Sequence, residues 1–164
     1  MAEVVENVVD LDSQYLTFVL DKQIMAIPLG DVEQIVSVLD ITPIPETPPY
    51  FVGVIDLRGS VVPVIDLRLR FGKEAAPYTE KTSFIICRVD NTLVGCVVDH
   101  VEDVMSVTAK QRSAMPSVGV TQCGEFATGI ARVETDTEVK MVLLLDTNRL
   151  VKDEDVESIL GVAE

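Results

Sequence analysis

Two stretches of this chain are copies of one pattern. Residues 15–38, YLTFVLDKQIMAIPLGDVEQIVSV, align without a gap on residues 84–107, FIICRVDNTLVGCVVDHVEDVMSV. Each copy has two apolar runs of strand type around a two-residue polar turn, followed by a V-E-x-I/V segment. The second halves correspond more loosely, through Gly53-Val54 with Gly129-Ile130 and through residues 64–66 with 144–146. The repeat therefore predicts two similar lobes.

Short apolar strands separated by turn residues dominate both lobes. Each lobe supplies about five strands rich in Val, Ile and Leu, and such strands with tight turns are typical of small β-barrels. We therefore predict an all-β chain of two packed five-stranded barrels, the first over residues 13–72 and the second over residues 80–150. Residues 1–12 are expected to be flexible. Short helical segments are expected at 31–38, from Asp66 onward, at 108–112 and at 153–160, the last as a C-terminal helix (151–164) packed on the domain.

Charge and composition exclude several classes of partner. The formal net charge of −14 disfavours nucleic acid, since lysine and arginine neutralise phosphates in such complexes, and it disfavours anionic membrane surfaces. No stretch approaches the roughly 20 apolar residues of a membrane span, and the start MAEVVENVVD lacks a basic region followed by an apolar one. We expect a cytoplasmic protein whose partners are proteins or small molecules.

The three cysteines, Cys87, Cys96 and Cys123, show no metal-ligand spacing. If Asp90-Asn91 forms a hairpin turn, Cys87 and Cys96 share one face of the hairpin as diagonal neighbours. A disulfide is then compatible with the side-chain directions. We interpret them as buried free thiols, because cysteine commonly behaves as a small core hydrophobe.

Residues 48–72, PPYFVGVIDLRGSVVPVIDLRLRFG, predict a tight hairpin. Gly59-Ser60 suits a two-residue type II′ loop, which would pair Asp56 with Pro63 and Leu57 with Val62. Alternation then assigns Ile55, Leu57, Val62 and Val64 to the core face. The other face would carry apolar bulk together with Asp56 and Arg58, the chemistry of a docking surface.

Catalytic and metal-binding patterns are weak in this sequence. The single histidine, His100, lies beside Asp99 and near Asp103, a grouping that would suit an acid–base pair or a weak metal site, but adjacent strand residues point to opposite faces. We interpret His100 as a solvated turn residue. The sequence contains no phosphate-binding glycine loop, no G-x-S-x-G motif and no EF-hand loop. We predict neither catalysis nor a cofactor nor a bound metal.

The ordered pattern P/Y-x-x-G-V-x-x-L-R-G-x-x-V/I-P-V-x-D-L-R, preceded by VEQIVSV and followed by LVGCVVDHVEDVMSVT, resembles the CheW family of chemotaxis coupling proteins. The resemblance covers roughly residues 13–150. It implies two SH3-like barrels and no enzymatic activity. It also implies a scaffold, monomeric by itself, that joins the cytoplasmic tips of chemoreceptors in arrays to the regulatory domain of the histidine kinase CheA.

The resemblance also assigns residues. Arg58 is placed in the receptor-binding surface, and Val32 and Ile35 match apolar receptor-contact positions. The family usually has Glu where this chain has Gln34, and Asn where it has Asp56, so the receptor preference is open. The structural signature of the family matches Gly53, Leu57, Gly59, Pro63, Asp66 and Leu67.

Two other functions stay open on the sequence alone. One is a CheW-like adaptor in another chemosensory system, controlling surface motility or development. The other is a small β-barrel enzyme or ligand binder, which would require a deep pocket containing His100 and carboxylates.

Overall fold

The computed structural model describes residues 13–114 and 126–151, and the expectations for residues 1–12, for Cys123 and for residues 153–160 lie outside that range. The strands in this part of the chain are β1 Gln14–Leu20, β2 Gln23–Pro28, β3 Val32–Ser37, β4 Phe51–Leu57, β5 Ser60–Asp66, β6 Ser83–Val89, β7 Thr92–Val98, β8 His100–Ser106, β9 Arg112–Ser113, β10 Ala127–Glu134 and β11 Val139–Leu145. The helices are short: η2 Leu29–Asp31, α2 Leu67–Arg70 and α3 Thr147–Val151. The predicted class, all-β with a few short helices, is confirmed.

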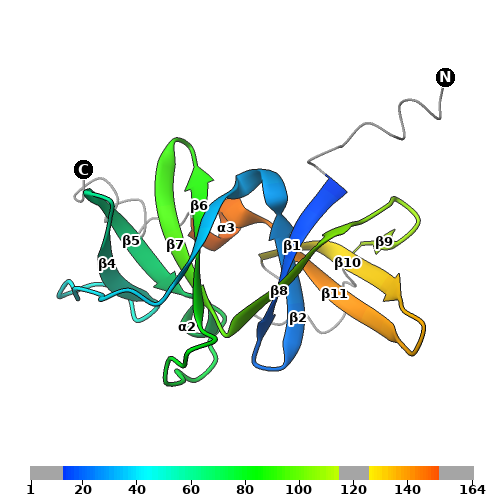
Figure 1. The fold of residues 1–164 in the computed structure, drawn as a ribbon, viewed down its shortest axis with the longest axis horizontal. Helices are drawn as coiled ribbons and strands as arrows, with labels where there is room; N and C mark the ends of the chain where they lie inside the picture. The colour runs from blue at the N-terminus through cyan, green and yellow to red at the C-terminus, as the bar shows by residue number, and fades with distance from the viewer. Residues whose placement is uncertain (1–12, 115–125, 152–164) are drawn as a thin grey trace.

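The strands form two sheets that lie side by side in Figure 1. Sheet A has six strands in the order β8-β1-β2-β11-β10-β9, and sheet B has five in the order β3-β6-β7-β5-β4. Most neighbours are antiparallel, but β11 pairs with β2 and β5 pairs with β7 in parallel. These two parallel pairs occupy corresponding places, so the sheets are built on one plan.

The repeat seen in the sequence is present in the structure. A shift of 69 residues carries β1 onto β6 residue for residue, and it carries β2 and β3 onto β7 and β8 to within one residue. The two hairpin turns also match, because Asp21 and Lys22 have φ of 51° and 69°, while Asp90 and Asn91 have φ of 50° and 65°. Positive φ at both central residues is the mark of a type I′ hairpin, whose twist matches that of its strands. The predicted Asp90-Asn91 turn is therefore confirmed.

The repeat predicts that the chain passes from the first barrel to the second at residues 72–80. The two sheets do not follow this division. Sheet A combines the β1–β2 hairpin of the first copy with β8–β11 of the second, and sheet B combines the β6–β7 hairpin of the second copy with β3–β5 of the first. The two copies have exchanged hairpins within one chain. Because the hairpins carry equivalent apolar faces, the repeat predicts the strands but does not decide which copy each hairpin joins.

Two of the expected helical segments are absent. Residues 31–38 form the end of η2 and strand β3, and residues 108–112 form a turn that leads into β9. In β3 the main-chain ladder with β6 decides the conformation, since isolated helices of this length have little stability of their own. The helix expected from Asp66 is present as α2, and the Asp66 carboxylate accepts a hydrogen bond from the Arg68 N–H at 2.9 Å as its N-cap.

Three apolar clusters hold the sheets together. The core of sheet B contains Ile55, Leu57, Val62, Val64, Phe84, Ile86 and Val97. The core of sheet A contains Tyr15, Ala26, Val107, Ala131, Val142 and Leu144. A larger interface core takes residues from both sheets and from α2 and α3, among them Leu16, Phe18, Met25, Ile65, Ile85, Cys87, Val94, Cys96, Leu143 and Leu150. Strands β1 and β6 alternate between a sheet core and the interface core, so each is buried on both faces.

The expectation for Cys87 and Cys96 is confirmed. Both thiols are free and buried in the interface core. Cys87 pairs with Val94 and Cys96 with Ile85, so the two cysteines are diagonal neighbours on one face of the β6–β7 hairpin. A hydrogen bond with Cys96, together with burial, raises the pKa of the Cys87 thiol well above its ordinary value. A thiol in that state is a poor nucleophile.

Candidate functional site

The tip of the β4–β5 hairpin differs from the sequence prediction by two residues in register. Leu57 pairs with Ser60 and Asp56 with Val61, so the loop is Arg58-Gly59 and not Gly59-Ser60. Arg58 has a φ of 53° and Gly59 a φ of 89°. An Asp56 carboxylate oxygen accepts a hydrogen bond from the Gly59 N–H at 2.9 Å, which favours this tighter turn.

The predicted faces of the hairpin survive the change of register, because a shift of two residues leaves every side chain on its side of the sheet. The four residues expected in the core, Ile55, Leu57, Val62 and Val64, all belong to the core of sheet B. On the outer face, Val61 is paired with Asp56 and is 62% exposed. The docking surface predicted from the alternation therefore has an apolar side chain beside the turn.

Arg58 is an exposed residue at the turn itself, and not a strand residue beside Asp56 as expected. The Asp56 carboxylate is engaged by the Gly59 backbone. Within residues 13–114 and 126–151, no hydrogen bond or ion pair involves the Arg58 guanidinium. The hairpin thus presents a cation whose hydrogen-bond donors face solvent.

A β-bulge in β3 brings Val32 and Ile35 onto one face. Val32 pairs with Cys87 and Ile35 with Ile85, although three positions separate them, because the register shifts between Val32 and Gln34. Cys87 and Ile85 both point to the interface core, so Val32 and Ile35 lie on that side of sheet B. Val32 is half-buried against the interface core and Ile35 is 44% exposed.

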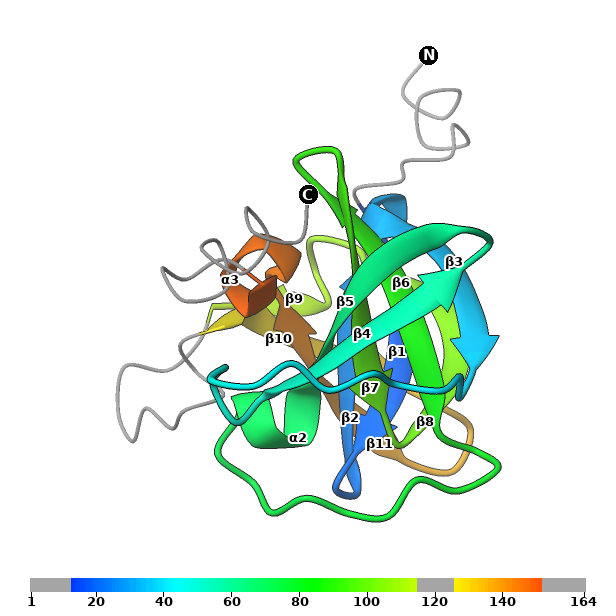
Figure 2. The ribbon, with the colours of Figure 1, turned by 90° about the vertical axis from the view of Figure 1, so that its left-hand side faces the viewer.

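Gln34 is not brought together with these two residues. It pairs with Ile86, whose side chain points into the core of sheet B, so Gln34 lies on the opposite face of β3. Strand β3 is an edge strand, and its Val36 packs on the same core as Leu57 at the base of the hairpin tip. Figure 2, which faces sheet B, shows β3 and the β4–β5 hairpin in the foreground. Arg58 and β3 therefore border the same barrel.

Sheet A carries the counterpart of the Val32–Ile35 pair, which sequence reasoning missed. Val101 pairs with Phe18 and Val104 with Leu16 across an equivalent bulge, so both face the interface core from the other sheet. Val101 is half-buried and Val104 is 46% exposed, close to the value for Ile35. The repeat alignment places Val101 on Val32 and Val104 on Ile35, and this signal could have found them.

The remaining residues of the family signature stabilise the fold through burial, hydrogen bonds or backbone conformation. Leu57, Pro63, Asp66 and Leu67 are buried. Asp66 also accepts a hydrogen bond from the Tyr78 hydroxyl at 2.9 Å, and desolvation outweighs these bonds and raises the pKa of its carboxyl. At Gly53 an added Cβ would overlap the Thr42 carbonyl oxygen. Gly59 is needed for its positive φ alone, since a Cβ there would meet nothing within 4 Å.

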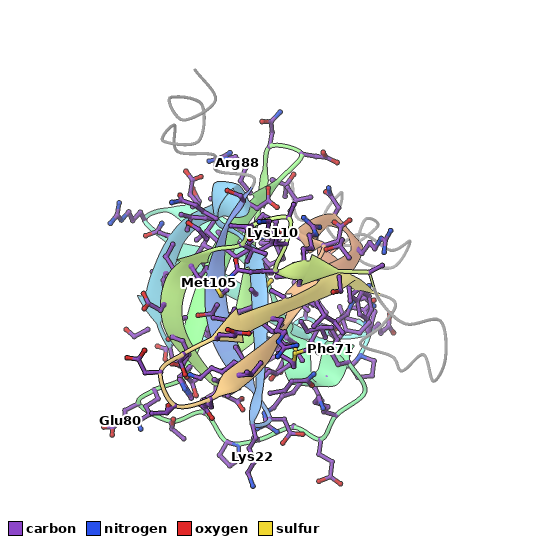
Figure 3. The ribbon with its side chains drawn as sticks, turned by 90° about the vertical axis from the view of Figure 1, so that its right-hand side faces the viewer. Lys22, Phe71, Glu80, Arg88, Met105 and Lys110 are labelled. Carbon is purple, nitrogen blue, oxygen red and sulfur yellow. The ribbon has the colours of Figure 1, made fainter. Side chains whose placement is uncertain are left out.

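An open cavity of about 220 Å³ lies along sheet A between β8 and the β10–β11 hairpin. Its walls are mainly apolar, with Ile24, Met105, Val133 and Val142 among the lining residues, and Met105 is labelled in Figure 3. Glu102 and Asp103 are its acidic members, and His100 does not line it. The deep pocket with His100 that an enzyme would require is not formed by these residues.

The lone histidine has a simple environment. His100 begins β8, and its Nε2 lies 3.2 Å from a Glu102 carboxylate oxygen, so the histidine is a strand residue and not a turn residue as interpreted from the sequence. Within the described ranges, no three His, Cys, Asp or Glu side chains gather in a way that could hold a metal ion. No helix in this part of the chain is sufficiently long and apolar to span a membrane.

Comparison with known proteins identifies the family. The CheW-like domain family matches residues 14–155. The chain is 34% identical over 151 residues to the chemotaxis protein CheW of Klebsiella aerogenes, covering 92% of this chain and 89% of that protein. It is 23% identical over 141 residues to protein FrzA of Myxococcus xanthus, covering 86% of each. The crystal structure of the scaffolding protein TtCheW from Thermoanaerobacter tengcongensis matches with a TM-score of 0.76 and 30% identity, covering 88% of this chain and 95% of that one. This chain therefore belongs to the CheW family of chemotaxis adaptor proteins.

Proposed function

We propose that this protein is a non-catalytic adaptor that couples the cytoplasmic tips of chemoreceptors to the regulatory domain of the histidine kinase CheA. Membership of the CheW family supports this proposal, as does the TtCheW neighbour, which is named a scaffolding protein. The protein would act in the cytoplasm, as a monomer recruited to membrane-bound receptor arrays. It would require neither a cofactor nor a metal.

The observation that carries the receptor assignment is the position of Arg58. The side chain stands at the tip of a type I′ turn that the Asp56–Gly59 hydrogen bond holds in place. Among the residues that the structure describes, the guanidinium has no ion pair to lose when it meets a carboxylate of another protein. In a chain with a net charge of −14, such a cation also gives an acidic partner a defined point of attachment.

The apolar part of the receptor surface would come from the margins of the interface core. Val32 and Ile35 line that margin on sheet B, and Val101 and Val104 line it on sheet A. Partly buried aliphatic side chains of this kind suit an amphipathic helix or helical hairpin, which docks its apolar stripe in a groove. Gln34 lies on the opposite face of edge strand β3, so we propose that it contacts a partner only at that free edge.

Only one sheet carries the arginine tip. The β10–β11 hairpin corresponds to β4–β5, and its sequence GIARVE has no L-R-G element. We therefore place the receptor contact on sheet B and expect the kinase to use other faces. Asp56 stands where the family usually has Asn; like Asn it offers a side-chain oxygen that can accept from the Gly59 N–H, but it adds a negative charge beside Arg58. That charge should bias the protein towards receptors with fewer acidic residues at this contact.

The test is an Arg58→Glu variant. Binding of a receptor cytoplasmic fragment should weaken about tenfold or more, because one attractive charge contact becomes repulsive. Binding of the CheA regulatory domain and the thermal midpoint should stay unchanged, since the side chain is exposed. The matched control is Arg132→Glu on sheet A, whose side chain is 61% exposed.

Undiminished receptor binding by Arg58→Glu, with the protein folded, would remove Arg58 from the receptor surface. Failure of the unaltered protein to bind either the receptor fragment or the CheA domain would refute the proposed function itself.

A second candidate is an adaptor in a chemosensory system other than flagellar chemotaxis. The similarity to FrzA, a relative that does not carry the CheW name, favours it. The same binding assay separates the two candidates when it is run with receptor fragments from each system of the source organism, because the preferred receptor identifies the pathway.

A further inference from the structure

A cluster of four charged residues joins the two sheets at one end of the molecule. The Arg68 guanidinium, on α2, donates to both carboxylate oxygens of Asp99, with Nε–Oδ1 at 2.8 Å and Nη2–Oδ2 at 2.6 Å. Asp99 Oδ2 also accepts from the Asp21 N–H at 2.8 Å. The Asp21 carboxylate lies 3.8 Å from Arg68 Nη1 and 3.4 Å from Lys73 Nζ.

These residues come from three separate places in the fold. Asp21 is in the β1–β2 turn of sheet A, Arg68 follows the last strand of the β4–β5 hairpin of sheet B, and Asp99 is the single residue between β7 and β8. Asp99 is thus the point at which the chain crosses from sheet B to sheet A. The Arg68 and Asp99 side chains are only 19% and 28% exposed, so solvent and salt screen this pair less than a surface ion pair.

The two positions of the repeat that correspond to Arg68 and Asp99 carry other residue types. The position that corresponds to Arg68 is Asn148, and the position that corresponds to Asp99 is Gly30, in the β2–β3 crossover. Neither a guanidinium nor a carboxylate is therefore available at those two places. The backbones of the two crossovers are similar, so the folding of such a crossover does not by itself require an ion pair between these two positions.

We propose that Arg68 is a positioning residue that clamps the β7–β8 crossover and thereby sets the place of β8, with Val101 and Val104, against sheet B. This inference rests on the proposed function, in which those two valines form the sheet A wall of the receptor surface. Arg68 itself does not touch the receptor. The clamp holds one wall of the groove at a fixed distance from the wall that carries Val32 and Ile35.

The clamp has a local signature in amide hydrogen exchange. In Arg68→Gln, exchange at Asp21 and at residues 99–102 should rise about tenfold, whereas exchange in the centre of β6 should stay unchanged, because a local opening leaves the global stability in place. The same variant should bind the receptor fragment several-fold more weakly. The control is Arg132→Gln, which breaks the exposed ion pair with Glu134 within sheet A and should change neither readout.

A second variant keeps the test decisive where Arg68→Gln does not fold. Asp99→Asn preserves the shape of the side chain and an oxygen for the Asp21 N–H, and it should give the same local rise in exchange. The double variant should exceed neither single one, since both remove one interaction. An increase spread evenly over both sheets, or no increase in either variant, overturns the clamp.

The two proposals fail in different ways. If Arg58→Glu abolishes receptor binding while Arg68→Gln alters neither exchange nor binding, the clamp is wrong and the receptor surface stands. If Arg68→Gln raises local exchange but leaves receptor binding unchanged, Arg68 has no positioning role for that surface. If Arg58→Glu binds normally, the assignment of Arg58 to the receptor surface fails.

Discussion

Replacing Gly53 by alanine probes the contact that closes the edge of sheet B. A Cβ at this position would overlap the Thr42 carbonyl oxygen and lie 2.7 Å from Cγ2 of Ile41. Gly53 also has a φ of 143°, a conformation that an L-residue adopts at a cost of about 1–3 kcal/mol. The clash is with backbone, so the Thr42 segment must move away from β4.

That movement breaks two hydrogen bonds, from the Thr42 N–H to Val54 O at 2.8 Å and from the Val54 N–H to Thr42 O at 2.9 Å. Each such bond contributes about 1 kcal/mol. Together with the backbone strain, Gly53→Ala should lower the free energy of unfolding by about 3–5 kcal/mol. The control is Gly59→Ala, which has positive φ but free space around the Cβ and should cost about 1–2 kcal/mol.

Urea denaturation followed by circular dichroism measures both values, and unchanged m-values would show that the same two states are compared. Equal losses for Gly53→Ala and Gly59→Ala would refute the reasoning, because they would mean that positive φ alone accounts for both glycines. The family signature would then report on backbone conformation and not on the closure of the sheet edge.

The remaining predictions concern packing and acid stability. Ile55→Ala, in the core of sheet B, should lower the free energy of unfolding by about 2–5 kcal/mol, whereas Val61→Ala on the outer face should change it by less than about 0.5 kcal/mol; comparable losses would show that the two faces are wrongly assigned. Partial burial tends to raise the pKa of Asp99, but the Arg68 hydrogen bonds and the Asp21 N–H outweigh it and hold that pKa below its ordinary value. The folded state therefore favours the Asp99 carboxylate, so its contribution to stability is complete above the ordinary pKa of about 4 and is lost as pH falls through the lower folded value. The stability of Asp99→Asn, measured by urea denaturation from about pH 6 to 3, should fall less steeply with acid than that of the unaltered protein; parallel slopes would contradict the ion pair.

Local sequence patterns predicted the strands and their faces well. The alternation in the β4–β5 hairpin correctly separated Ile55 and Val62 from Val61, and the repeat placed β6, β7 and β8 to within one residue. Local patterns were weaker at turns and bulges. The Gly59-Ser60 loop was a reasonable type II′ turn, but the Asp56 carboxylate and the twist of the strands favour Arg58-Gly59, with Arg58 itself in the left-handed region.

The candidate site was predictable in part. The Arg58 tip was visible in the sequence because L-R-G interrupts an apolar ribbon. The reason that Val32 and Ile35 share a face was not, since residues 31–38 were predicted to be helical, and in a regular strand two residues three positions apart lie on opposite sides. The bulge opposite Cys87 and Ile86 reverses that rule, and an equivalent bulge does so for Val101 and Val104.

The sequence by itself determined the class of structure, the position of most strands, the buried face of the β4–β5 hairpin and the duplication, because these depend on the order of apolar and polar residues over short distances. Only the tertiary structure decided which copy each hairpin joins, since the β1–β2 and β6–β7 hairpins offer equivalent edges and faces to either partner. That choice pairs β3 with β6 and β8 with β1, and the bulges that turn both apolar pairs towards the interface core lie in these two strand pairs. It also brings Asp21, Arg68 and Asp99 together from three distant parts of the chain, which no local pattern encodes.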